Sequence, residues 1–256
     1  MPKNHDLQEL RALLHAKPSE VTWSAICTCI ENLNKDILEV GLDYADEHLE
    51  RWPDDLRRLE CDLEQWQATM PLWWPLVRNI WLRSPEEDEI ELGERFDELY
   101  GEYDYDDEPD YDEFLAEHHR TESLKAFQAL LHTRDIKHIT VLDLGEIKVC
   151  PESLQLLTAS TQLARLTTLR LYETPISHKS VLVLEAATNM PSLTKLDLSD
   201  TDIGDAGIRV LASSPNFSKV TELSIDCNEI GDIGLSALAR SPPWPPLPAL
   251  PLPPPP

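Results

Sequence analysis

Apolar residues recur every 27 residues between positions 139 and 238 of this chain. The interval holds through four successive repeats, with no insertion or deletion between them. The six apolar columns begin at Ile139, Leu142, Leu144, Val149, Leu154 and Leu157. Self-similarity at a fixed period of this length is the signature of stacked units, none of which can bury its apolar face alone. The repeat therefore constrains the fold more than any other feature.

The spacing of apolar residues changes halfway along each unit. Leu142 and Leu144 alternate with polar positions, as in a strand with one buried face, whereas Leu154 and Leu157 have the spacing of one helical face. Each unit is predicted to form a strand, a turn, a helix and a return. Asp205 and Asp232 precede two of these helices and are expected to cap their free amides. The sequence thus predicts an α/β array, with parallel strands inside and helices outside.

The segment LTKLDLSDTDIGDAGIRVLASSPNFSK, residues 193–219, resembles the leucine-rich repeat, specifically the ribonuclease-inhibitor-like subtype. The resemblance covers about residues 139–241 and implies a solenoid that binds a protein partner on its concave face. One column departs from the family, because only the last of its four members is the asparagine that bridges neighbouring turns. The four members are Ile147, Thr174, Thr201 and Asn228. One period earlier, Phe127 and Leu130 predict a helical N-terminal cap.

The N-terminal residues 1–84 carry apolar residues at intervals of three and four, which predicts a small all-helical domain. Ser19 is a candidate N-cap, and the tryptophans of this region are expected to form a packed core, not an aromatic pocket. The segments AKPSE and LDYADEHLERWPD (42–54) resemble the helical companion domain that precedes such repeats in some bacterial proteins.

Residues 85–117 contain about 17 acidic side chains and a single Arg95. Charges this dense repel one another, so a flexible acidic linker is predicted; interspersed aromatic residues leave open that it folds onto a basic surface. The linker contributes most of the formal net charge of −25, which disfavours nucleic acid and anionic membranes and favours a basic protein partner. The repeat solenoid with its cap is assigned to residues 118–241.

The proline-rich residues 242–256 can form neither helix nor ladder, so a disordered or truncated end is predicted, with a polyproline ligand as the alternative. Trp244 falls on the column of Leu163, Met190 and Phe217, where it could plug the open end of the core.

The sequence lacks the nucleophile-elbow, P-loop and HExxH motifs, so no enzyme and no cofactor is predicted. No metal is predicted either, since the calcium-loop spacing from Asp104 has Pro109 where glycine is needed. No signal peptide or membrane span is recognised, and five unpatterned cysteines indicate reduced thiols. A monomeric cytoplasmic protein is expected.

The residues between the buried leucines are expected to form the exposed concave surface of the array. The leading hypothesis is a protein–protein interaction module that binds its partner there; the alternative makes the acidic tract an inhibitor or shield of a basic, nucleic-acid-binding protein. The candidate partner-binding residues are Asp143, Thr168, Arg170, Tyr172, Glu173, Lys195, Asp197, Asp200, Glu222 and Asp226. Tyr172 and Arg170 are of types enriched at interface hot spots.

Overall fold

The computed structural model describes residues 6–62, 65–66, 70–83, 89–100, 111–132, 135–145, 147–174, 176 and 178–241. The strands of this described part form one sheet in the order β1-β2-β3-β4-β5-β6, and every neighbouring pair is parallel. The strands are β1 (Arg58–Asp62), β2 (Asn79–Arg83), β3 (Val141–Asp143), β4 (Thr168–Arg170), β5 (Lys195–Asp197) and β6 (Glu222–Ser224). The predicted α/β class is confirmed.

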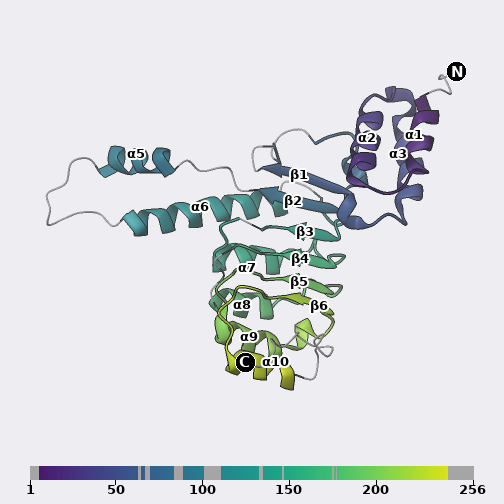
Figure 1. Cartoon of the computed structure of the whole chain (residues 1–256). Coiled ribbons are helices and arrows are strands. Elements are labelled where there is room, and N and C mark those ends of the chain that lie inside the picture. The colour runs from purple at the N-terminus through teal and green to yellow at the C-terminus, as the bar shows by residue number, and fades with distance from the viewer. Residues whose placement is uncertain are drawn as a thin grey trace, which may run out of the picture.

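Helices follow the strands along one side of the stack, while the first three helices lie beside its β1 end (Figure 1). The N-terminal helices are α1 (Asp6–Leu14), α2 (Glu20–Glu31) and α3 (Lys35–Leu49), followed by the short 3-10 turns η1 (Asp54–Leu56) and η2 (Trp74–Leu76). The later helices are α5 (Glu89–Tyr100), α6 (Tyr111–His132), α7 (Pro151–Ala159), α8 (His178–Glu185), α9 (Gly204–Ser213), the 3-10 turn η3 (Pro215–Phe217) and α10 (Asp232–Arg240).

Residues one 27-residue period apart pair with each other in the sheet from β3 to β6. Leu142 pairs with Leu169, Leu169 with Leu196, and Leu196 with Leu223. The helical columns meet the same core, where Phe127 and Leu130 of α6 are fully buried one period before Leu154 and Leu157. Each strand and its helix therefore cover the next pair, and apolar burial is continuous from unit to unit.

The prediction that residues 1–84 are all helical is wrong in its second half, which contains β1 and β2. The first half is helical, and Ser19 caps α2 by accepting a hydrogen bond of 3.1 Å from the Thr22 amide, as predicted. Leu56 and Leu59 are three apart, a spacing shared by a helix and by the start of the repeat's own strand motif. In β1, buried Leu59 and Cys61 alternate with more exposed residues, which is the burial pattern of a strand and not of a helix.

The first two strands extend the repeat pattern at irregular intervals. Val77, Ile80 and Leu82 are buried and reproduce the spacing of Ile139, Leu142 and Leu144. However, β2 starts 21 residues after β1, and the 62 residues from the start of β2 to that of β3 exceed the 27-residue period by 35. The acidic tract is thus an insertion within one unit, between a strand and its helix.

The inserted tract, expected to be a flexible linker, contains helix α5 and the first turns of α6. Leu92 and Phe96 of α5 are buried, and the ring of Phe96 lies edge-on to Tyr111 at 4.9 Å and to Phe114 at 5.2 Å. Apolar residues four apart give α5 one packing face, and the side chains of Glu94, Asp97 and Glu98 are exposed. This part projects away from the sheet (Figure 1). Residues 84–88 and 101–110 of the predicted linker lie outside the described residues.

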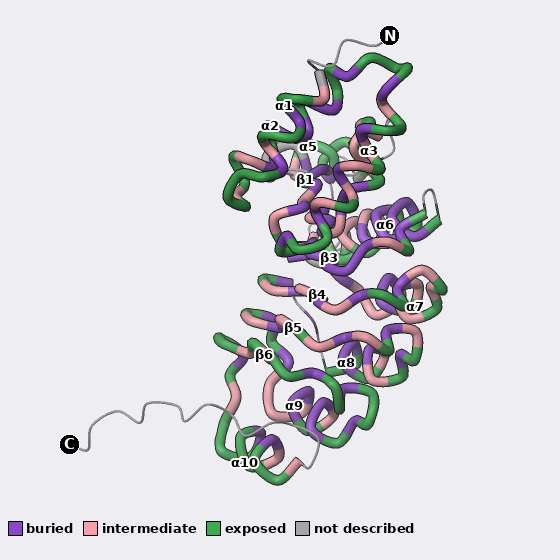
Figure 2. Tube along the Cα trace, turned by 90° about the vertical axis from the view of Figure 1, so that its right-hand side faces the viewer, coloured by how far each residue is buried: buried purple, intermediate pink, exposed green. Residues whose placement is uncertain are grey.

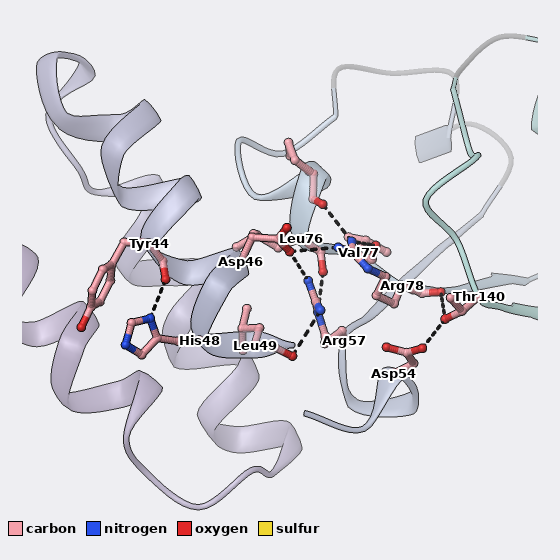
Figure 3. Close-up of polar contacts among 11 residues, drawn as sticks. Tyr44, Asp46, His48, Leu49, Asp54, Arg57, Leu76, Val77, Arg78 and Thr140 are labelled. Atoms are coloured by element: carbon pink, nitrogen blue, oxygen red, sulfur yellow. Dashed lines mark hydrogen bonds and ion pairs between the residues drawn. The ribbon is translucent and has the colours of Figure 1, made fainter. Parts of the chain in front are cut away.

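A buried arginine joins the N-terminal helices to the sheet (Figure 3). Arg57, just before β1, donates to the carbonyl of Leu76 at 2.8 Å, to that of Leu49 at 3.3 Å and to the Asp46 carboxylate at 2.8 Å. Arg78 donates to the same Asp46 oxygen at 2.9 Å. Burial and then the nearby Arg78 lower the pKa of the Arg57 guanidinium, which nevertheless stays charged near neutral pH. The cluster therefore fixes α3 against β1 and β2.

The expected capping role of Asp205 requires a correction. No side chain caps α9 or α10 from the N-cap position of its own helix. Instead, the Asp205 carboxylate reaches the next unit and accepts hydrogen bonds from the amides of Gly231 at 2.8 Å and Gly234 at 2.9 Å. Strand-to-helix turns are stacked one above another, so the carboxylate meets the free amides of α10 before those of its own helix.

Asp205→Ala should destabilise the protein by about 1 to 2 kcal/mol, because two amides at the start of α10 lose their acceptor. Asp232 occupies the equivalent position one period later, and no side-chain hydrogen bond of Asp232 is found among the described residues. Asp232→Ala is therefore the matched control and should change stability by less than about 0.5 kcal/mol. Urea unfolding of the two variants measures the difference, and equal effects would contradict capping across the repeat.

Candidate functional site

The strand face consists of the outward side chains of β1–β6 and of the turn residues that follow each strand. Burial along this face falls from one end to the other: β3 is buried, whereas β6 is largely exposed (Figure 2). The exposure expected of the predicted binding residues therefore fails at its N-terminal end, where Asp143 and Thr168 are each only 6% exposed.

The N-terminal half of the strand face is covered by its own side chains. The Arg58 guanidinium lies 4.8 Å from the centre of the Trp81 ring. Arg170 pairs with Asp143 at 3.3 Å and with Asp55 of η1 at 2.9 Å, so it spans the sheet instead of pointing to solvent. Burial raises the pKa of Asp143, although the Gly145 amide and Arg170 oppose that shift. These charges are satisfied within the chain and leave little for a partner.

The turn residues of the predicted site have two kinds of environment. The Tyr172 ring packs over Gly145, where a Cβ atom would stand 2.2 Å from the ring, and Tyr172 is half-buried. Glu173 and Asp200 are exposed in left-handed backbone with φ of 52° and 56°, and Cys227 repeats this conformation one period later at 55°. The periodic left-handed residue turns the chain after β4, β5 and β6.

The C-terminal half of the strand face contains a polar hollow of about 200 Å³. Lys195 pairs with Glu222 at this hollow at 3.0 Å. The hollow is lined by Thr168, Arg170, Lys195, Leu196, Asp197, Glu222 and Ser224. Of the predicted residues, the structure thus brings together those on β4, β5 and β6.

Two further predicted residues lie in the turns next to this hollow. The Asp200 amide donates to the Asp226 carbonyl at 2.8 Å, so the turns after β5 and β6 are stacked and both acidic side chains are exposed. Asp143 lies apart from them, under Arg170.

Sequence reasoning missed the face residues Asp55, Arg58 and Trp81, because β1 and β2 do not follow the 27-residue period. The signal that could have found them is the half-motif Val77-x-x-Ile80-x-Leu82, which places Trp81 between two buried positions. The charge pair between Asp55 and Arg170 joins residues 115 apart and has no local signal.

A larger hollow, about 680 Å³, lies among residues of α1, α2 and the turn after α2, a region to which the sequence analysis assigned no binding residue. Val21, which is 81% exposed, lies at this hollow. It is lined by Glu9, Glu20, Val21, Ser24, Ala25, Thr28, Cys29, Asn32 and Leu33.

Among the residues that the structure describes, no three His, Cys, Asp or Glu side chains are grouped so that they could hold a metal ion. Within the same residues, no helix has the length and apolar character to cross a membrane.

The different burial of the five cysteines can be tested by thiol labelling. None forms a disulfide; Cys27 is buried and Cys227 is exposed. Burial, reinforced by Glu31, raises the pKa of the Cys27 thiol to about 12, so Cys27 carries on the order of a thousandfold less thiolate than a thiol at the ordinary value of 9.0. We expect a thiol-alkylating reagent to label Cys227 in the folded protein and Cys27 only after denaturation, as followed by peptide mass spectrometry. Equal labelling rates without denaturant would contradict the burial of Cys27.

Comparison with known proteins agrees with the repeat geometry. The family described as Leucine Rich repeat matches residues 189–212 and 218–239, which cover β5 with α9 and β6 with α10 except for the last residue of each helix. A comparison with curated proteins finds no match. Leucine-rich repeats are generally non-enzymatic modules for protein–protein interaction. The matched segments, together with the parallel register of the sheet, support a leucine-rich-repeat protein.

Proposed function

We propose that this chain is a ribonuclease-inhibitor-like solenoid that binds a protein partner on the concave face, at β4–β6 and the turns after them. The observation that carries the proposal is the polar hollow lined by Lys195, Asp197 and Glu222. On the same sheet, the first three strands are covered by the chain's own side chains, whereas the last strands are not. An exposed row of mixed polar side chains around a hollow suits recognition of another protein.

The charges around the hollow favour a basic partner. Four carboxylates lie at or beside the hollow against one lysine, Lys195, which already pairs with Glu222. The four are Asp197, Asp200, Glu222 and Asp226. Arg170 is held by two carboxylates and does not offset them. Complementary charge of this kind speeds association and rejects acidic competitors, and its contribution falls with ionic strength.

The proposal includes a monomeric, cytoplasmic chain with a bacterial-type helical companion segment at α1–α3. The absence of disulfides among the five cysteines supports a reducing compartment. The Arg57 cluster supports a fixed placement of these helices at the β1 end of the sheet.

The acidic insertion carries a second candidate function, as an inhibitor or shield of a basic protein. Its support is that α5, with five acidic residues and Arg95, projects away from the sheet (Figure 1). A long acidic projection attracts basic surfaces electrostatically, and such binding weakens steeply with salt.

A quantitative pull-down at low and moderate salt tests both candidates. Glu222→Lys combined with Asp226→Lys should reduce partner capture at least tenfold, because two exposed carboxylates beside the hollow are reversed. Asp232→Lys combined with Glu39→Lys makes the same change in net charge away from the strand face and should leave capture unchanged.

A variant of α5 with Glu89, Glu91, Glu94 and Glu98 changed to Gln separates the two candidates. If the α5 variant still captures the partner and the variant with Glu222→Lys and Asp226→Lys does not, the partner binds at β4–β6. Capture lost with the α5 variant, and lost steeply with salt, would overturn the concave-face proposal in favour of the insertion.

A further inference from the structure

The hollow of about 680 Å³ at α1 and α2, called the helix hollow below, extends along one face of α2. Its lining residues on this face recur at intervals of four and three, from Val21 through Ala25 and Thr28 to Asn32. At about 1.5 Å per residue the face is about 17 Å long, or about three helical turns. The helix hollow lies beside the β1 end of the array, away from β6 (Figure 1). The predicted proline-rich end, residues 242–256 with Trp244, lies outside the described residues.

The helix hollow presents apolar side chains that the core leaves uncovered. Val21 is 81% exposed, Ala25 is half-buried, and Leu33 lines the hollow while it packs into the core at 7% exposed. The polar side chains beside them are engaged within α2. The Thr28 hydroxyl and the Asn32 side-chain amide donate to backbone carbonyls of this helix at 3.0 and 2.8 Å. Apolar contact is therefore what this surface offers a ligand.

The charge of the helix hollow is negative. Its lining contains Glu9 of α1 and Glu20 of α2 and, among the described residues, no lysine or arginine. The Glu20 side chain is 76% exposed and lies 3.7 Å from Arg58, which leaves it open to a second cation. A second copy of this chain that docked by the same face would oppose the same carboxylates, so like charge disfavours a dimer here. A basic ligand has the complementary charge.

We propose that the helix hollow binds an amphipathic helix of a basic partner protein. The apolar side chains of that helix would contact Val21, Ala25 and Leu33, and its cations would lie beside Glu9 and Glu20. Three turns give room for apolar anchors at positions i, i+4 and i+7. The hollow is bordered by helices, whose backbone groups are bonded within each helix, so it offers no strand edge, and helices pack by placing the ridges of one into the grooves of another. This surface is separate from the strand face and does not depend on the function proposed there.

A synthetic helix of about 18 residues, with leucines on one face and lysines on the other, is the probe for this site. Fluorescence anisotropy with the full chain at moderate salt measures its affinity. Val21→Asp should weaken binding at least about tenfold, because it removes the most exposed apolar contact of the hollow. Val21 is the second residue of α2, where aspartate favours the helix, so the variant should fold. Since the variant also gains a negative charge, a peptide attracted by charge alone would bind it at least as tightly as it binds the unaltered chain.

Val40→Asp is the matched control, because Val40 is a 59% exposed valine of α3 outside the hollow, and its variant should bind the peptide as the unaltered chain does. A peptide of the same composition, with leucines dispersed around the helix, should bind at least about tenfold more weakly. Glu222→Lys with Asp226→Lys should leave peptide binding unchanged at a salt concentration that screens distant charges. The proposals for the helix hollow and for the strand face can therefore fail independently.

The proposal is overturned if the amphipathic peptide does not bind, or if Val21→Asp leaves its affinity unchanged. Equal weakening by Val40→Asp, or equal binding of the dispersed peptide, would also overturn it, because net charge and not the hollow would then hold the peptide. A dimer in sedimentation that Val21→Asp dissociates would make a second copy the occupant in place of a basic partner.

Discussion

Arg57→Ala should destabilise the folded protein by about 3 to 5 kcal/mol, because it removes the partner of three acceptors at a buried site. The side chain of Arg57 is 3% exposed, so water cannot replace it at the carbonyls of Leu76 and Leu49. Asp46 retains Arg78, which limits the loss. Urea unfolding followed by tryptophan fluorescence measures the change, since Trp23, Trp52 and Trp66 are buried in this half of the chain.

The adjacent Arg58→Ala is the matched control for this prediction. Within the described part of the chain, the ion pairs of Arg58 are long, with Glu20 at 3.7 Å and Glu60 at 3.8 Å, and its side chain is 34% exposed. Its contact with Trp81 contributes about 0.5 to 1 kcal/mol, so the variant should lose no more than about 1 kcal/mol. If the two arginine variants lose equal stability, the buried cluster does not join the helices to the sheet.

Asn228→Ala should destabilise the last unit by about 3 kcal/mol. The Asn228 side chain is buried and makes five hydrogen bonds. Its oxygen accepts from the Thr201 amide at 3.1 Å and the Ile203 amide at 3.3 Å, and its nitrogen donates to the Leu198 carbonyl at 2.6 Å. Without Asn228 these buried groups lose their partner, which costs about 1 to 3 kcal/mol for each unsatisfied group.

The loss should be local, because units in a stacked array are coupled only to their neighbours. Hydrogen exchange should therefore accelerate in β6 and α10 before it does so in β3. Asn216→Ala, in the segment just before β6, removes an exposed hydrogen bond to the Glu185 carbonyl and should lose less than about 1 kcal/mol. An Asn228 variant as stable as the Asn216 variant would show that the bridge between turns contributes little.

The repeated half of this protein could be predicted from its amino-acid sequence. Six apolar columns at one period define the strand, the helix and the register together. This is because equivalent residues in each unit pack against equivalent residues in the next unit. The position of Leu169 between Leu142 and Leu196 could be predicted from the period alone. The bridge at Asn228 could likewise be predicted, since its partners Thr201 and Leu198 lie 27 and 30 residues earlier, about one period away.

The rest depends on tertiary contacts that join residues at no regular interval along the chain, so no periodic pattern in the sequence reveals them. The 35-residue excess between β2 and β3 hid two strands and made an inserted acidic segment look like a linker between domains. Asp205 caps the helix of the following unit because the turns of successive units are stacked. The residues next to Asp205 in the sequence do not determine this contact. Likewise, Asp143 and Arg170 have the spacing of exposed face residues. Asp143 is buried, and Arg170, although it lines the hollow, is paired with Asp143 and with Asp55, 115 positions before it, and therefore offers little charge to a partner.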